Sequence, residues 1–190
     1  DVSLRGQVWG HVLRSPHAHA KILSVDTSAA EVAPGVLRVL TGADWAAENY
    51  GGLPCEDLKK SRPDGSPIYH PTYPVLAQDR VRSVGEGVAF VVAETALQAR
   101  DAAELIDVTY EPLPAVADVE AAVAPGAPLV WDDCADNISF VEHKGDAAAV
   151  DAAFAKAAHV VRRKLVNNRI TAVALEPRGC IGDYDRRHGR

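Results

Sequence analysis

Residues 80–114 read RVRSVGEGVAFVVAETALQARDAAELIDVTYEPLP, and this stretch decides the fold because several structural periods follow one another in it. Residues 81–84 alternate apolar with polar side chains, and residues 88–93 form a continuous apolar run, which is typical of a strand buried on both faces. Gly85 and Gly87 bracket Glu86 and permit a tight turn or a bulge. The pattern predicts two successive strands.

A helix and a further strand are predicted next. Thr95 and Gln98 have the spacing of a capping box, in which each side chain satisfies a backbone donor of the first helical turn. Small and apolar residues then recur at helical spacing and form one stripe, at Ala99, Ala102, Ala103 and Ile106. Residues 108–110 return to a two-residue period, and the prolines at 112 and 114 end strand pairing. The stretch therefore predicts a β-β-α-β core.

The residues on either side extend this pattern. Strands are predicted at 7–13, 20–25 and 36–40, with short helices at 27–32 and 41–48, and Trp45 is interpreted as a core anchor and not as a ligand platform. Beyond the core, the sequence predicts a short helix at 118–123 and a domain boundary near 132–137, then a strand at 138–143, a helix from 145, and strands at 159–166 and 172–184. We expect an α/β protein of the α+β type, with a mixed sheet and short helices, plus the start of a second α/β domain.

Charge, cysteines and length limit the functional classes. The 190 residues carry a formal net charge of -6, which argues against a nucleic-acid partner, and the basic run 162–164 is interpreted as a solvated edge. Three widely spaced cysteines fit neither a disulfide framework nor a zinc site and favour the reducing cytoplasm. No segment reaches the roughly 20 apolar residues that span a bilayer. Because the chain lacks an initial Met and ends directly after a strand pattern, we expect a piece of a longer protein.

Several residues are candidates for chemistry, each with a structural alternative. His17 and His19 would share a face of an extended segment and bind a metal if a third ligand came from elsewhere, or else bond to the backbone in a turn. Glu86 is a general base if it is buried and a solvated turn residue otherwise. Residues 176–178 (Glu-Pro-Arg) would hold an anion or form a surface ion pair.

The segment 50–74 is rich in glycine, proline and charged residues and is predicted to be a long surface or interface loop. It contains Cys55, Tyr69 and His70, for which no nucleophile-base spacing follows from the sequence. Elsewhere the chain has no G-x-S-x-G, P-loop, G-x-G-x-x-G, H-E-x-x-H or C-x-x-C motif.

Five segments together resemble the molybdenum-binding large subunit of the xanthine dehydrogenase, aldehyde oxidase and aerobic carbon monoxide dehydrogenase family. They are RSPHAHAKI at 14–22, PVLA with DRV at 74–81, VGEGVAFVVA at 84–93, YEPLPAV at 110–116 and LEPRG at 175–179. The resemblance implies an α/β hammerhead domain over residues 1–130 and the beginning of a molybdopterin-binding domain over residues 137–190.

The resemblance also implies a chemistry for the full-length subunit. Molybdenum held by molybdopterin transfers a water-derived oxygen to an aldehyde, an N-heterocycle or carbon monoxide, and electrons leave through iron-sulfur clusters and FAD in partner subunits or domains. The pterin-binding glycine segments and the catalytic glutamate of the family have no match here, and no cysteine spacing fits an iron-sulfur cluster. We therefore assign no catalytic, cofactor-binding or metal-binding residue to this chain.

Two interpretations of the whole chain remain. In the first, it is an inactive, structural part of a molybdenum hydroxylase whose apolar residues near 165–181 stay exposed or pair with a second copy. In the second, it is a free-standing binding or assembly module with a hammerhead fold and no molybdenum.

Overall fold

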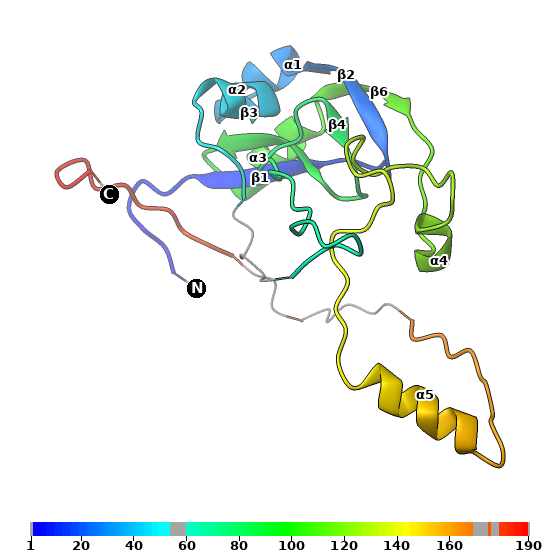
Figure 1. The fold of residues 1–190 in the computed structure, drawn as a ribbon. Coiled ribbons are helices and arrows are strands. Elements are labelled where there is room, and N and C mark those ends of the chain that lie inside the picture. Colours follow the sequence, from blue (N-terminus) through cyan, green and yellow to red (C-terminus); the bar gives the residue numbers. More distant parts are fainter. Residues whose placement is uncertain (1, 54–59, 169–174, 176–178, 190) are drawn as a thin grey trace. The chain divides into compact units, whose positions relative to one another are not determined.

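The computed structural model describes residues 2–53, 60–168, 175 and 179–189 (Figure 1). The chain divides into two compact units, residues 1–143 (unit 1) and residues 144–190 (unit 2). Unit 1 contains two three-stranded sheets and the helices α1 to α4, and unit 2 contains the single helix α5 in its described part.

The first sheet has the strand order β1-β5-β3 and consists of β1 (Trp9–Arg14), β5 (Gly87–Ala93) and β3 (Val36–Thr41). The second has the order β4-β2-β6 and consists of β4 (Arg80–Val81), β2 (Ala20–Asp26) and β6 (Asp107–Pro112). Every pair of these strands is antiparallel. The expected mixed sheet is thus two antiparallel sheets, because α3 (Ala96–Ala103) leads from β5 in one sheet to β6 in the other and forms no parallel β-α-β unit.

The core of unit 1 lies where α3 packs against the first sheet (Figure 1). Alternate residues of β5 point to this side, and Ala89 and Val91 are fully buried there. The helix presents Ala99, Ala102 and Ala103, all buried, and such small side chains let the helix approach the strands closely. A second cluster, between the two sheets, contains Ala20, Ala77, Val81 and Val88.

The predicted β-β-α-β core is confirmed, with one local difference at the start of α3. The Thr95 hydroxyl accepts a hydrogen bond from the Gln98 amide at 3.2 Å and donates one to the Gln98 side-chain oxygen at 2.8 Å. The Gln98 side chain thus bonds the cap hydroxyl and not the cap backbone. The full capping box occurs instead at α2 (Gly42–Ala47), between Thr41 and Asp44.

The short helices lie close to their predicted positions. They are α1 (Ser28–Glu31), α2, and α4 (Val119–Ala122), whose first turn is capped by the Asp118 carboxylate. The segment 138–143, predicted as a strand, forms a single antiparallel bridge between Val141 and Ser61. A further backbone hydrogen bond joins the Tyr69 amide to the Ser139 carbonyl oxygen at 2.9 Å, but the two contacts do not form a continuous ladder.

Unit 2 differs most from the prediction. Helix α5 (Ala147–Lys156) is present with Asp146 as its cap, as predicted. The strands expected at 159–166 and at 179–184 are absent from these described residues, since strand geometry needs a hydrogen-bonded neighbour and unit 2 provides none there. The described side chains of unit 2 are all exposed, including Phe154, Leu165 and Ile181. The rest of the last predicted strand, 172–178, lies outside the described residues apart from Leu175.

Candidate functional site

The turn between β4 and β5 is held by the end of β1. The Gly85 amide donates to the Ser15 carbonyl oxygen and the Ser15 amide donates to the Glu86 carbonyl oxygen, both at 2.8 Å. The Arg14 guanidinium adds a bond to the Gly85 carbonyl oxygen at 2.7 Å. Gly85 has a φ of 87°, a conformation that glycine adopts without the steric cost of a side chain. The turn is therefore held by two residues at the end of β1, Arg14 and Ser15.

The Glu86 side chain is buried, with 7% of its surface exposed. One carboxylate oxygen accepts a hydrogen bond from the Arg82 amide at 2.6 Å, and the other is buried without a partner. Burial raises the pKa of the neighbouring Tyr73 hydroxyl, and the Glu86 carboxylate adds to that rise. The interpretation of Glu86 as a solvated turn residue is thus wrong. The Arg82 amide, at the start of the same turn, donates a hydrogen bond to the Glu86 carboxylate inside the protein. Glu86 lines none of the four cavities described in unit 1.

Both histidines, His17 and His19, contact other residues of unit 1. The His19 ring nitrogen Nδ1 lies 2.9 Å from the Pro114 carbonyl oxygen, and the His17 ring packs at 4.7 Å from the Tyr110 ring. His19 thereby takes the backbone-bonded alternative. Among the described residues, no three or more His, Cys, Asp or Glu side chains are grouped so that they could hold a metal ion.

Two arginines of the core stretch bind the segment that starts at residue 130. Arg80 forms an ion pair with Asp132 at 2.9 Å. The Arg82 guanidinium lies 3.8 Å from the centre of the Trp131 ring and donates to the Val130 carbonyl oxygen at 3.2 Å. A guanidinium over an indole face is a favourable cation-π contact. Both arginines therefore face an aromatic and acidic stretch of the same chain.

A third arginine binds the next part of that segment. Arg62 pairs with Asp136 at 2.8 Å, and its other terminal nitrogen donates to the Ile138 carbonyl oxygen and contacts the Cys134 sulfur at 3.5 Å. Its side chain is only 17% exposed. We call Arg62, Arg80 and Arg82 the arginine face, and residues 130–142 the strap.

Other described residues of the predicted loop 50–74, which also contains Arg62, contact the strap as well. The Tyr69 hydroxyl donates to Asp133 at 2.5 Å, and this contact together with burial, the larger cause, raises the pKa of Tyr69 to about 12. The Tyr69 amide also donates to the Ser139 carbonyl oxygen at 2.9 Å, and the Ser139 hydroxyl donates to the Tyr69 carbonyl oxygen at 2.6 Å. Lys60 pairs with Glu142 at 2.9 Å. The described part of the loop is thus an interface within unit 1.

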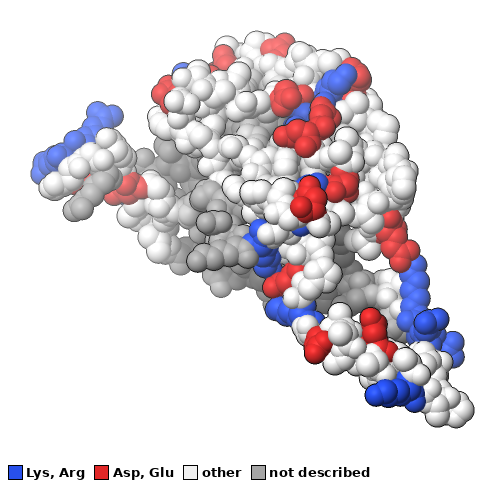
Figure 2. Space-filling model, viewed as in Figure 1, with Lys and Arg blue, Asp and Glu red and all other residues white. Residues whose placement is uncertain are grey.

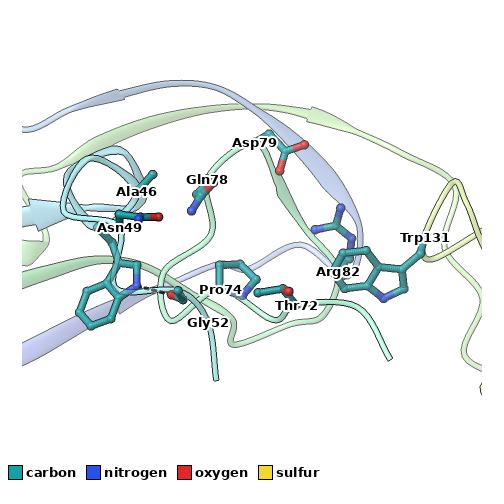
Figure 3. A pocket seen from close by; sticks show the side chains of 11 residues that line it. Ala46, Asn49, Gly52, Thr72, Pro74, Gln78, Asp79, Arg82 and Trp131 are labelled. Atoms are coloured by element: carbon teal, nitrogen blue, oxygen red, sulfur yellow. Dashed lines mark hydrogen bonds between the residues drawn. The ribbon is translucent and has the colours of Figure 1, made fainter. Parts of the chain in front are cut away.

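A cavity of about 340 Å³ lies beside the arginine face (Figure 3). Figure 3 shows Arg82 against Trp131 at one end of the cavity, and Ala46 and Asn49 at the other. Trp45 also lines it, held by a bond from its indole nitrogen to the Gly51 carbonyl oxygen at 2.7 Å. Trp45 is half-buried, so it acts as an anchor of the cavity wall more than of the core.

A second, more apolar cavity of about 480 Å³ lies under the strap. It is lined from the loop side by Tyr69 and His70 and from the strap side by Trp131 and Cys134. His70 is thereby placed at a cavity wall. Cys134 is a free thiol with 4% of its surface exposed, whereas Cys180 is free and exposed.

The strap carboxylates give a direct electrostatic prediction. The Arg80 guanidinium, by hydrogen bonding and by charge, lowers the pKa of Asp132. A lowered folded pKa means that the pair contributes stability at neutral pH and loses it as the pH falls through the lowered value. We expect Arg80→Met to raise the pKa of Asp132 back toward the ordinary carboxyl range, measured by NMR titration of the side-chain carboxyl carbon.

Asp26 is the matched control for that titration. Hydrogen bonds from Ser28 lower its pKa, and Arg80 is not among the causes, so the same substitution should leave Asp26 unchanged. An Asp132 pKa that stays lowered in Arg80→Met would show that the ion pair is not its cause.

Other candidates from the sequence take no part in this site. The basic run 162–164 is exposed in unit 2, and residues 176–178 and Cys55 lie outside the described residues. On the side of unit 1 drawn in Figure 2, described acidic and basic side chains are interspersed among uncharged ones and form no continuous basic surface.

The arginine face was not predicted from the sequence. The available signal was the alternation of Arg80 and Arg82 on one side of a strand, with acidic residues at 132–136 as their counterpart.

Two family models match the chain. Residues 1–114 match the family described as "Aldehyde oxidase and xanthine dehydrogenase, a/b hammerhead domain", and residues 130–190 match "Molybdopterin cofactor-binding domain". The carbon monoxide dehydrogenase large chain of Afipia carboxidovorans is 36% identical over 100% of this chain and 23% of its own length. The nicotine 6-hydroxylase large subunit of Paenarthrobacter nicotinovorans is 37% identical over 97% of this chain and 22% of its own length.

A solved structure gives the same result. The reconstituted CO dehydrogenase from Oligotropha carboxidovorans superposes with a TM-score of 0.68 and 38% identity, over 83% of this chain and 20% of that one. The chain therefore spans less than a quarter of the length of these relatives. With more than half of its residues matched by the hammerhead model, the chain belongs to the aldehyde oxidase and xanthine dehydrogenase hammerhead-domain family.

Proposed function

We propose that this chain is the N-terminal part of the large subunit of a molybdenum hydroxylase and that it acts in that subunit as a scaffold. The full-length subunit would oxidise an aldehyde, an N-heterocycle or carbon monoxide with water as the oxygen source. We divide the chain into a hammerhead domain at residues 1–130 and the beginning of a molybdopterin-binding domain at residues 137–190.

The observation that carries this proposal is the order of the two family matches along one chain. A hammerhead match at 1–114 is followed by a molybdopterin-domain match at 130–190, and a carbon monoxide dehydrogenase large chain aligns across both. A free-standing module would need only the first match.

We propose that none of the described residues holds molybdopterin. The described side chains of residues 144–189 are all exposed, and the four cavities described above are lined by residues no later than 139. A bound cofactor of this kind needs a closed cradle with hydrogen-bond donors. We therefore assign no described residue to the cofactor and expect it to be held by later parts of the subunit.

The partners follow from the same proposal. The relatives are named as a large chain, a large subunit and a subunit of a dehydrogenase complex, so they belong to assemblies of several subunits. We propose that iron-sulfur and FAD subunits or domains accept the electrons here as well.

The cytoplasm is our proposed location, on the basis of the free thiols of Cys134 and Cys180. No helix in the described part of the chain is long and apolar enough to cross a membrane.

The intact mass of the native protein distinguishes the two interpretations of the chain. A scaffold in a large subunit requires several hundred residues beyond position 190, with glycine-rich pterin-binding segments. A native protein that ends soon after Arg190 would contradict the proposal and favour the free-standing module.

A further inference from the structure

The compact unit does not end where the hammerhead family match ends. The match stops at residue 114 and the molybdopterin-domain match begins at residue 130, but unit 1 continues to residue 143. The strap, residues 130–142, thus carries the opening sequence of one domain family while it is packed on the folded body of another. This disagreement needs a physical cause.

The cause lies in the charges of the two surfaces. The arginine face presents three guanidinium groups, and two of them meet the carboxylates of Asp132 and Asp136. The Arg80 and Arg62 side chains are 14% and 17% exposed, whereas their partners Asp132 and Asp136 are 77% and 42% exposed, so each pair is buried on the arginine side. Partly buried pairs are screened by salt less than exposed ones.

The contacts also continue along the strap from end to end. Arg82 holds Val130 and Trp131 at the start, Arg62 holds the middle, and the bridge from Ser61 to Val141 closes the end. The Asn137 side chain accepts a hydrogen bond from the Val130 amide within the strap and donates to the Ala122 and Pro128 carbonyl oxygens of the segment before it. Asn137 has a φ of 57°, which asparagine tolerates better than most residues.

We propose that the arginine face is a docking surface for the strap and that it fixes the point at which the chain leaves the hammerhead unit. Arg62, Arg80 and Arg82 are positioning residues in this sense. The covalent linker after Pro114 does not set the exit point; the docked strap does, and the region after residue 143 starts from it. The inference concerns the strap and stands whether or not the full-length protein carries molybdenum.

Cys134 provides a reporter for the strap within the 190-residue chain. Cys134 is part of the strap and its thiol is buried against unit 1, whereas the Cys180 thiol is exposed. A buried thiol reacts with an alkylating reagent only when the segment covering it opens. The side chains of Arg80 and Arg82 bond other residues of the strap and not the Cys134 sulfur, so replacing them changes the opening of the strap and not the thiol itself.

The test is the rate at which N-ethylmaleimide labels Cys134 in the Arg80→Met/Arg82→Met double variant, followed by mass spectrometry of each cysteine peptide. Loss of an ion pair and of a cation-π contact should raise the rate at Cys134 by about tenfold to a hundredfold. Cys180 should be labelled equally fast in every variant. The matched control, Arg38→Met/Arg100→Met, removes two exposed arginines elsewhere on unit 1 and should leave the Cys134 rate unchanged.

Two results would overturn the proposal. The first is a Cys134 rate in the double variant equal to that of the wild type. The second is a faster rate accompanied by loss of amide protection in α3 and β5, because the two arginines would then hold the whole unit and not the strap. Retention of slow labelling in Arg80→Lys, together with protected α3 amides, would support the charge-based docking.

Discussion

Replacing Val91 with aspartate is expected to lower the free energy of unfolding of unit 1 by about 3–5 kcal/mol, the range for an uncompensated buried charge. Val91 is fully buried in the central strand β5, between β1 and β3 and beneath α3. Domains have a total stability of about 5–15 kcal/mol, so this change removes a large share of it. Urea unfolding followed by circular dichroism measures the loss.

The control for this prediction is Leu37→Asp in the neighbouring strand β3. Leu37 is 55% exposed, so its aspartate remains in contact with water and should change stability far less. Equal losses in the two variants would contradict the placement of β5 at the centre of the core.

Gly42→Ala is expected to lower the free energy of unfolding by about 1–3 kcal/mol through overpacking. A methyl group at position 42 would lie 2.2 Å from the Ala77 carbonyl oxygen and 2.7 Å from its carbon. Both are backbone atoms of the segment that leads into β4, so they cannot rotate away as a side chain would. The same urea titration measures the effect.

Gly182→Ala is the matched glycine substitution, because an added methyl group there meets no atom within 4 Å. Its midpoint in urea should equal that of the wild type. If Gly42→Ala also unfolds at the wild-type midpoint, the close approach of α2 to the segment before β4 is wrong.

The core was predictable because its signals are local. A continuous apolar run predicts β5, and the small-residue stripe predicts which side of α3 meets the sheet. The pairing of strands was not predictable in the same way. Which strand lies beside β5 depends on contacts between residues far apart in the chain, and the short β4 contributes only two residues.

The candidate site was largely hidden from the sequence for the same reason. Arg62 and Asp136 are 74 residues apart, and nothing in their local patterns links them. Glu86 between two glycines has the pattern of an exposed turn. The turn is folded so that the Arg82 amide donates a hydrogen bond to the Glu86 carboxylate. Burial of a polar residue is decided by such long-range packing, which a pattern of neighbours does not record.

Unit 2 shows the converse case, in which a strand predicted from the sequence does not form. The sequence predicts a strand at residues 159–166, but these residues are exposed and form no strand. The exposure of Leu165 and Val166 agrees with the expectation of exposed apolar surface. A β pattern states a preference, and it becomes a strand only when a neighbouring strand accepts its hydrogen bonds.

The most direct test of the account is the molybdenum content of the purified full-length protein, measured by inductively coupled plasma mass spectrometry beside the recombinant 190-residue chain. The account predicts stoichiometric molybdenum in the full-length subunit and none in residues 1–190. A full-length subunit without molybdenum would contradict its assignment to a molybdenum hydroxylase, and stoichiometric molybdenum in the 190-residue chain would contradict its role as a scaffold.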